Sequence, residues 1–122
     1  MIESKILVDK YVDQIAIIAD QRKFVSALIV PEYRLLESYA RSHDIAFSNR
    51  EELCRDKRIV NMITDRIDTL QQQLAHYEQV KRFTLLPQPF SMERGELTNT
   101  LKIKRRVLNE NYKTEIDRMY AE

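Results

Sequence analysis

The chain has 122 residues, of which 43% are hydrophobic and 32% are charged, a balance typical of one folded domain and unlike that of disordered chains. Its formal net charge is only +1, so we expect no nucleic-acid binding, which usually depends on a clear surplus of positive charge. The single cysteine, Cys54, excludes an internal disulfide framework and favours a reducing, cytoplasmic compartment.

Two further classes of protein are not expected from the sequence. No apolar stretch approaches the roughly 20 residues that cross a bilayer, and the chain starts without the apolar core of a secretory signal. His43 and His76 lie far apart, and neither has a cysteine, histidine or carboxylate partner at metal-ligand spacing. We therefore predict neither a membrane-spanning protein nor a metal site.

The first third of the chain predicts a short helix followed by an antiparallel hairpin. Apolar residues at the start share one face of a helix, and the β-branched run at 12–19 then predicts a strand. Four polar residues, 20–23, separate this strand from a second apolar run at 24–30, which is the pattern of a hairpin. Pro31 ends the second strand and suits the first turn of a following helix.

A capping box and a long apolar stripe predict one long helix over residues 51–80. The box is Ser48-Asn49-Arg50-Glu51. In the interpretation that we prefer, the stripe packs across the domain's own small sheet, because about three heptads are short for an isolated coiled coil. In the alternative, a stand-alone interaction module, the same helix pairs with a partner. The stripe comprises Val60, Ile63, Ile67, Leu70, Leu74 and Tyr77.

The remaining elements complete a small α+β domain. An apolar run at 83–86 predicts a third strand, which Pro87 and Pro89 stop from continuing. Apolar residues at helical spacing from Val107 to Met119 predict a closing helix. We therefore expect the α+β class, with a small antiparallel or mixed sheet of about three strands covered by helices.

The only glycine of the chain, Gly95, precedes a run of hydroxyls and cations in which we expect the chemistry. Glycine takes positive φ without steric cost, so its isolated use indicates a backbone position that other residues fill poorly. The hydroxyl and ammonium groups that follow are groups that bind phosphate. Judged from the residues alone, such a cluster is more often a solvated face or a loose anion patch than a catalytic site. Its cations are Lys102, Lys104, Arg105 and Arg106.

Two segments carry a resemblance to long-chain fatty acid CoA ligases, members of the AMP-forming acyl-CoA synthetase superfamily. Residues 20–31 resemble the hairpin and strand of that family's C-terminal domain. A second segment resembles its lysine motif, and the resemblance places Lys102 in the active site, with the hydroxyls of Thr98 and Thr100 before it as candidate substrate-binding groups. From the residues alone, the favoured role of these two hydroxyls is to cap the loop and the helix that follows. The family usually has proline where this chain has Asn99, a change that loosens the loop without removing a donor or a charge. The motif is Glu93-x-Gly95-Glu96-Leu97-Thr98-x-Thr100-x-Lys102-x-Lys104-Arg105.

The resemblance implies a two-step reaction in a larger enzyme. The fatty acid carboxylate attacks the α-phosphate of ATP, which is supplied with Mg²⁺, and the CoA thiol then displaces AMP from the acyl-adenylate. The family's C-terminal domain pivots between the steps, and Lys102 is implied to act in the first. Residues 1–122 match this domain alone, so the expected partner is an N-terminal adenylate-forming domain that, like the hinge, has no counterpart here. We expect the chain alone to be inactive and the parent enzyme to be cytoplasmic, with at most peripheral contact to the inner membrane.

Overall fold

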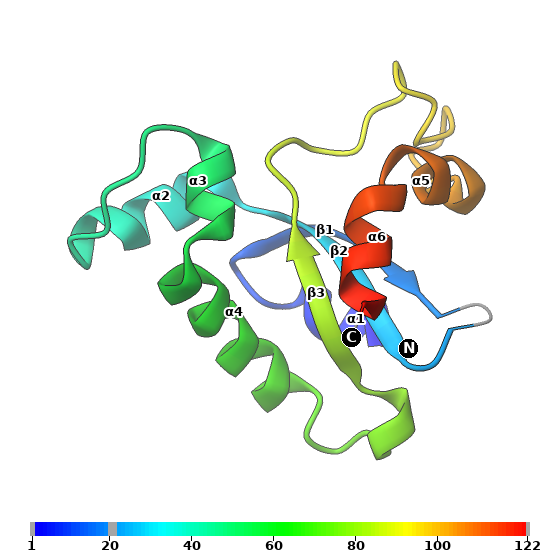
Figure 1. Ribbon diagram of the computed structural model, residues 1–122, viewed down its shortest axis with the longest axis horizontal. Coiled ribbons are helices and arrows are strands. Elements are labelled where there is room, and N and C mark those ends of the chain that lie inside the picture. Colours follow the sequence, from blue (N-terminus) through cyan, green and yellow to red (C-terminus); the bar gives the residue numbers. More distant parts are fainter. Residues whose placement is uncertain (1, 20–21, 122) are drawn as a thin grey trace.

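The computed structural model describes residues 2–19 and 22–121, which build a three-stranded sheet with helices packed on both of its faces (Figure 1). The strands lie in the order β1 (Val12–Ile18), β2 (Val25–Pro31) and β3 (Val80–Leu85). β1 and β2 pair antiparallel, whereas β2 and β3 pair parallel, so the sheet is mixed. The expected α+β class and the hairpin are confirmed, although Asp20 and Gln21 of the predicted connection lie outside the described residues.

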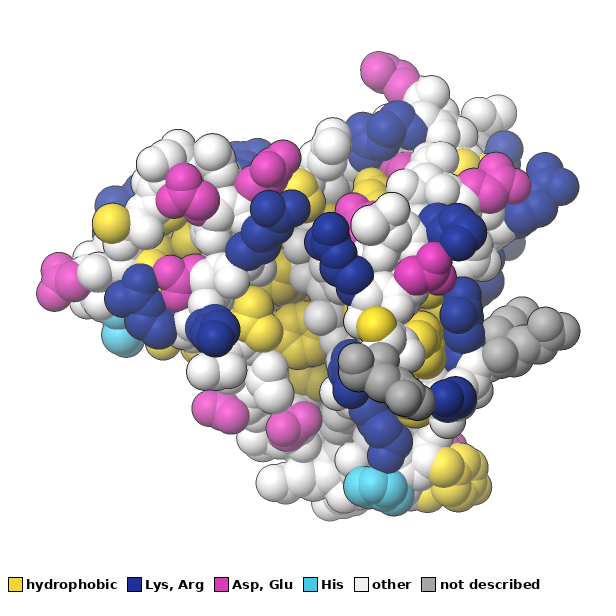
Figure 2. Space-filling model, in the orientation of Figure 1, with side chains coloured by type: hydrophobic (Ala, Val, Ile, Leu, Met, Phe, Trp, Pro, Cys, Tyr) yellow, Lys and Arg dark blue, Asp and Glu magenta, His cyan; other side chains and the backbone are white. Residues whose placement is uncertain are grey.

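Six helices surround this sheet in the described part of the chain. In Figure 1, α6 crosses in front of the sheet, α1 lies behind it and α4 runs beside β3. The face shown in Figure 2 carries charged side chains of both signs, interspersed, in keeping with a net charge near zero. The helices are α1 (Ile2–Leu7), α2 (Tyr33–Ser42), α3 (Arg50–Arg55), α4 (Lys57–Leu70), α5 (Arg105–Asn111) and α6 (Lys113–Tyr120), with one 3-10 turn, η1 (His76–Glu78).

The starts of two helices differ in detail from the sequence prediction. Pro31 is the last residue of β2, and α2 begins only after Glu32. α3 is capped by Asn49 rather than by Ser48, because the backbone of Asn49 is extended (φ −155°, ψ 174°) and its side-chain oxygen accepts a hydrogen bond from the Glu52 amide at 2.8 Å. This bond satisfies one of the amides that have no partner within the helix.

The single long helix predicted over residues 51–80 is wrong. Asp56 interrupts it, because its backbone is extended (φ −64°, ψ 126°) and its carboxylate accepts a hydrogen bond from the Arg58 amide at 2.9 Å, which caps α4. α4 ends at Leu70, and by Val80 the chain is already in β3. The apolar spacing in the sequence continues past these helix ends, because it indicates only which side chains are buried. The ends themselves depend on polar side chains that bind the backbone.

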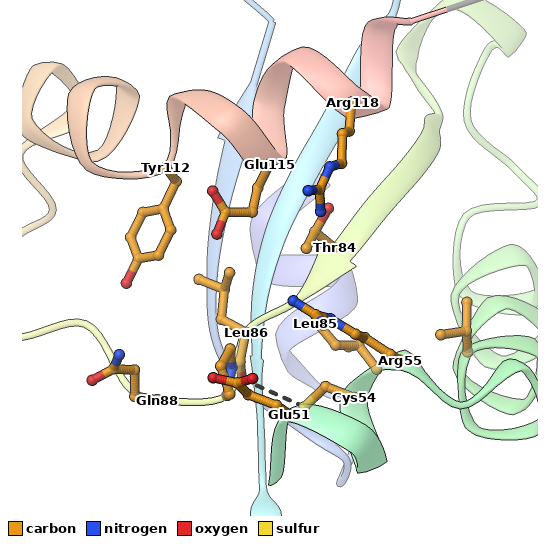
Figure 3. Close-up of a pocket in the computed structure, with 12 residues that line it drawn as sticks. Glu51, Cys54, Arg55, Thr84, Leu85, Leu86, Gln88, Tyr112, Glu115 and Arg118 are labelled. Atoms are coloured by element: carbon orange, nitrogen blue, oxygen red, sulfur yellow. Dashed lines mark hydrogen bonds between the residues drawn. The ribbon is translucent and has the colours of Figure 1, made fainter.

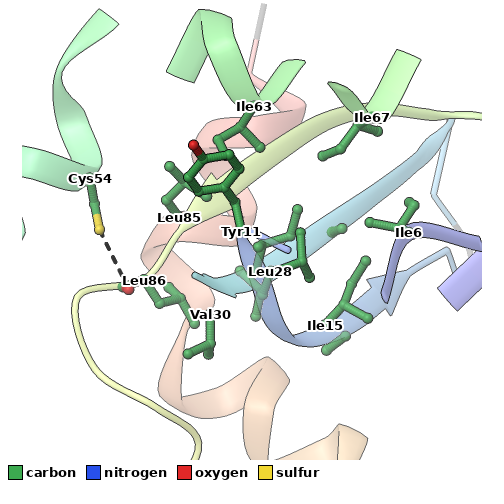
Figure 4. Close-up of a cluster of buried hydrophobic side chains, with 14 of the residues drawn as sticks. Ile6, Tyr11, Ile15, Leu28, Val30, Cys54, Ile63, Ile67, Leu85 and Leu86 are labelled. Atoms are coloured by element: carbon green, nitrogen blue, oxygen red, sulfur yellow. Dashed lines mark hydrogen bonds between the residues drawn. The ribbon is translucent and has the colours of Figure 1, made fainter. Parts of the chain in front are cut away.

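The apolar face of α4 packs inside the domain, as the preferred interpretation predicts. Ile63 and Ile67 are buried together with Ile6 of α1 and Leu85 of β3 (Figure 4). Burying one aliphatic side chain contributes roughly 1.5–3 kcal/mol, so the domain itself uses this face. The side chain of Tyr77, at the far end of the predicted stripe, is 79% exposed. The alternative, in which residues 51–80 pair with a partner as one helix, therefore has no continuous seam.

β3 and the closing helix also have boundaries that apolar spacing did not predict. β3 starts at Val80, because the side-chain amide of Gln71 donates to the Val80 carbonyl and accepts from the Val80 amide, each at 2.9 Å. The closing helix is divided at Tyr112 into α5 and α6. The Arg82 guanidinium donates to the Met119 carbonyl at 2.7 Å, which fastens β3 to the end of α6.

Candidate functional site

The predicted lysine segment lies between β3 and α5, in residues 86–104, where the described chain has no helix and only an isolated β-bridge. Figure 1 shows it as a long connection that leaves the sheet and returns to α5. The segment is fastened early in its course, because the Phe90 amide donates to the side-chain oxygen of Gln14 on β1 at 2.9 Å. The lysine is therefore carried by an irregular segment that is anchored to the sheet.

Gly95 has the positive φ that its isolated use predicts. Its φ is +75°, and its amide donates to the Met92 carbonyl at 2.9 Å, which closes a turn. A Cβ added there would lie 3.8 Å from Val107, an ordinary contact, so glycine is favoured by the backbone conformation rather than by a lack of space. The turn brings the Glu96 amide to the Ser91 carbonyl at 2.9 Å.

Directly after this turn, Glu96 is a fully buried carboxylate. It accepts hydrogen bonds from the Ser91 amide (3.0 Å), the Arg94 guanidinium (3.1 Å) and the Asn111 side-chain amide (3.0 Å). Burial acts to raise the pKa of Glu96, but the bonds from Asn111, Arg94 and Ser91 outweigh it and hold the pKa below its usual value. Arg94 also donates to the Pro89 carbonyl. An ionised Glu96 thus joins the turn to α5.

A small antiparallel hairpin carries the lysine. Leu97 and Ile103 face each other in the isolated β-bridge, and nearer the tip the Thr98 amide donates to the Lys102 carbonyl at 2.8 Å. Leu101, at the tip, has a φ of 63° and a side chain that is 67% exposed. A left-handed conformation is costly for a residue with a Cβ, so the surrounding bonds hold the backbone just before Lys102 in a strained shape.

The hydroxyls of Thr98 and Thr100 shape this tip. Thr98 Oγ1 accepts a hydrogen bond from the Lys102 amide at 3.0 Å and lies 3.1 Å from Thr100 Oγ1. α5 begins after Lys104, whose side chain makes no capping bond, so neither threonine caps that helix. The sequence predicted that these hydroxyls cap both the loop and the helix, and the structure confirms this only for the loop.

The four cations of the motif have different environments. Arg105 donates to the Ile17 carbonyl at 2.5 Å and to the Glu3 carboxylate at 2.9 Å, so it fastens α5 to β1 and α1. The other three are exposed, and their side chains have no hydrogen bond or ion pair with another described residue: Lys102, Lys104 and Arg106. Arg105 therefore has a structural role, whereas the three cations around it have unpaired side chains among the described residues.

The sequence did not reveal the residues that hold this segment in place. Arg94 and Asn111, which are themselves exposed, both bond to the buried carboxylate of Glu96, and Asn111 lies 15 residues beyond Glu96. One feature of the sequence could have indicated that Glu96 is important, namely its place inside the motif directly after the only glycine. Asn111 had none, because a polar residue on a predicted helix is ordinarily assigned to the solvated face.

None of five hollows on the described surface, of 210 to 660 Å³, is lined by Lys102. One of 360 Å³ lies between α3, β3 and α6, and another of 360 Å³ is bordered by Glu3, Arg22 and Arg105. Among the described residues, no group of three His, Cys, Asp or Glu side chains is placed to hold a metal ion, and no helix is long and apolar enough to cross a bilayer. The exposed side chain of Lys102 thus lies outside these hollows.

Comparisons with known proteins agree on one family. Residues 1–122 match the family model described as the C-terminal domain of AMP-binding enzymes. The chain is 37% identical over 100 residues to human long-chain-fatty-acid–CoA ligase 1 and 34% identical over 98 residues to the peroxisomal long chain acyl-CoA synthetase 7 of Arabidopsis thaliana. These matches cover 80% and 79% of this chain but only 14% of each relative.

A solved structure has the same fold. The adenylation domain of a carboxylate reductase from Mycobacterium chelonae superimposes with a TM-score of 0.78 at 26% identity, over 99% of this chain and 17% of that one. The chain thus spans 14% to 17% of the length of these three proteins.

Proposed function

Since this chain belongs to the family of C-terminal domains of AMP-binding enzymes, we propose that it serves as the mobile, lysine-bearing domain of an ATP-dependent long-chain fatty acid CoA ligase. The names of the human and Arabidopsis relatives support the long-chain acyl class. Their lengths support a larger enzyme, because the chain corresponds to 14% of each. In this proposal the enzyme activates a fatty acid with ATP as an acyl-adenylate and then transfers the acyl group to CoA.

The proposal assigns Lys102 to the adenylation step. When a fatty acid carboxylate attacks the α-phosphate of ATP, negative charge moves from the carboxylate to the phosphoryl oxygens and the departing pyrophosphate. An ammonium on a flexible stem can contact both groups as this charge moves. The observation that carries the assignment is a free side chain on a fixed backbone: Lys102 is exposed and unpaired among the described residues, while its amide and carbonyl are both bonded to Thr98.

The substrates are assigned to a partner, the N-terminal adenylate-forming domain of the same enzyme. In this proposal Mg²⁺ arrives with ATP as part of the substrate. Thr98 and Thr100 are occupied in shaping the tip, so their contribution is to position Lys102, with any contact to phosphate secondary. CoA and the fatty acid meet the domain only when it faces the partner.

The test separates the two half-reactions in the enzyme that contains this domain. Lys102→Ala should slow acyl-adenylate formation by at least about 10²-fold, the usual scale for removing one group that stabilises transition-state charge. Thioester formation from supplied acyl-adenylate should stay near the wild-type rate, because the domain turns another face to the active site for that step. ATP–pyrophosphate exchange and thioester release measure the two rates.

Lys104→Ala and Arg106→Ala are matched controls, because these cations are also exposed and unpaired among the described residues. Both should leave each half-reaction nearly unchanged. Equal, small losses in both half-reactions for all three variants would show that the cluster acts only as diffuse positive charge, and the assignment of Lys102 would be wrong.

A further inference from the structure

The two edges of the sheet differ in what covers them. At the β1 edge, the Ile17 carbonyl accepts a hydrogen bond from Arg105 at 2.5 Å, and the Gln14 side chain accepts one from the Phe90 amide at 2.9 Å. Later parts of the chain therefore cover this edge. At the β3 edge, no further strand pairs on the outer side among residues 2–19 and 22–121.

The open edge of β3 presents backbone groups at its centre. The Leu86 amide donates to the Ile29 carbonyl of β2 at 2.9 Å, which fixes the direction of the backbone groups at this end of the strand. Because these groups alternate in direction along a strand, the N–H and C=O groups of Phe83 and Leu85 point away from β2. An unpaired row of this kind is a template for another strand.

Both ends of this edge are already closed by side chains. At the start, the buried amide of Gln71 makes two 2.9 Å bonds to the backbone of Val80, as a neighbouring strand would. At the far end, the Leu86 carbonyl accepts from the Tyr33 hydroxyl at 2.5 Å and from the Cys54 thiol at 3.6 Å. Only the central part of the edge is left for a partner.

A groove runs along this open part. It consists of a hollow of 210 Å³ beside Phe83 and Thr64, and a hollow of 360 Å³ beside Leu85 and Cys54, and Val60 lines both. Figure 2 shows hydrophobic side chains on the floor of this depression, between the α4 side and the α6 side of the molecule. The edge is therefore reached through a groove that has apolar side chains on its floor.

The larger hollow has charges that are separated by sign. Figure 3 shows that Arg118 of α6 extends toward Thr84 and Arg55 of α3 toward Leu85, whereas Glu115 lies on the side of Tyr112 and Glu51 beside Leu86. None of these four side chains has a hydrogen bond or ion pair with another described residue. Two unpaired guanidinium groups thus flank the open edge, where an acidic side chain would pair with them.

We propose that this groove binds an extended peptide segment of another protein, which adds a strand to β3 and places an acidic side chain between Arg55 and Arg118. The backbone of the segment pairs with Phe83 and Leu85, and its apolar side chains enter the two hollows beside Val60. This interaction is independent of the proposed acyl-CoA ligase function, because it uses the β3 edge and not the Lys102 hairpin.

Charge favours this occupant over a second copy of the chain. β3 of another copy would bring Lys81 and Arg82 to a groove that already has Arg55 and Arg118, so self-pairing places cations against cations. A helix is also a poor occupant, because its own backbone groups are bonded internally and cannot pair with Phe83 and Leu85. An acidic extended segment satisfies both the backbone and the charges.

The probe is a short acetylated and amidated peptide in which valine and threonine alternate around one central glutamate. Titrated into the isotope-labelled chain, it should shift the amide resonances of Phe83 and Leu85 and slow their hydrogen exchange. Replacing its glutamate by lysine should weaken binding at least about tenfold, because the charge then opposes the two arginines. Methylating the peptide nitrogens that face β3 should abolish binding, because those nitrogens can no longer donate.

Charge reversal in the protein supplies the matched test. Arg55→Glu and Arg118→Glu should each weaken the glutamate peptide about tenfold and strengthen the lysine peptide, whereas Arg34→Glu, an exposed arginine on α2, should change neither. Thermal melts of each variant establish that it is folded. Equal binding of the glutamate and lysine peptides, unchanged binding after nitrogen methylation, no binding at all, or resonance shifts confined to β1 would overturn the proposal.

Discussion

Glu96 is the residue on which the shape of the lysine hairpin most directly depends. Besides the three bonds to its carboxylate, its carbonyl accepts from the Lys104 amide at 2.8 Å, at the base of the hairpin. A buried charge is tolerable only where donors surround it, and Glu96 has such donors from Ser91, Arg94 and Asn111. Removing the charge leaves those donors, which meet at a part-buried site, without a suitable acceptor.

Glu96→Gln should therefore lower the free energy of unfolding by about 1–3 kcal/mol, because the new amide group turns a donor toward the donor of Asn111. Since the pKa of Glu96 is lower in the folded chain, its stabilising contribution is fully present above the unfolded value of about 4.3 and is lost as pH falls through the folded value. Denaturant melts at neutral and acidic pH should show the difference between wild type and variant shrinking in acid.

Glu93→Gln is the control for this measurement, because Glu93 is exposed in the same segment. It should leave stability almost unchanged at neutral pH. A difference between wild type and Glu96→Gln that stays constant into acid would mean that the shape of the side chain matters there and its charge does not.

At the scale of the elements, the sequence predicted best those that are continuous apolar runs. β1 and β2 have ends within one residue of their predicted positions, because nearly every residue of β2 and about half of β1 enter the core. The break before α4 and the start of β3 depend instead on Asp56 and Gln71, whose side chains bind backbone groups. Single polar residues carry no periodic signal, so these boundaries were missed.

In the candidate site, too, some residues could be predicted from the sequence and others could not. Gly95 and Lys102 could be singled out because one is unique in composition and the other belongs to a motif. The contact between Glu96 and Asn111 could not, because it arises only when the turn and α5 are brought together. The sequence therefore indicated the residue proposed to act on substrate and not the residues that hold it in place.

The burial of α4 leads to a prediction about folding. Ile67 is 2% exposed, so Ile67→Ala should leave a cavity and lower the free energy of unfolding by about 2–5 kcal/mol without changing the oligomeric state. Denaturant melts and sedimentation on the same variant measure the two quantities. Tyr77→Ala, at a position that is 79% exposed, should change neither. A dimer that Ile67→Ala dissociates, with monomer stability intact, would support the partner-pairing alternative instead.

At the scale of the whole molecule, the described structure contains a continuous core but no enclosed substrate pocket at the lysine. Buried residues from all three strands and from the surrounding helices form one hydrophobic cluster. Such a domain should unfold in a single cooperative transition. The free Lys102 ammonium, by contrast, lies on an open surface outside the hollows of 360 Å³.

The isolated chain should therefore fold and be catalytically silent. Calorimetry should detect no binding of ATP or of palmitate at micromolar concentration, because ligand sites are normally concave pockets that enclose most of the ligand. A single calorimetric unfolding transition on the same sample shows that silence is not caused by misfolding. Ligase turnover by this chain alone would contradict the assignment of the substrate pockets to a partner domain.

The hydrogen bonds of Arg105 to Ile17 and Glu3 bear on how fast Lys102 can be withdrawn in the proposed reaction. They fasten α5 to β1 and α1 directly behind the hairpin, so the tip does not swing away as a free loop does within nanoseconds to microseconds. Withdrawing Lys102 from a substrate then requires the whole domain to turn, which takes microseconds to milliseconds. A body of that size drags solvent with it, so the interval between the two chemical steps should lengthen as the viscosity of the medium rises.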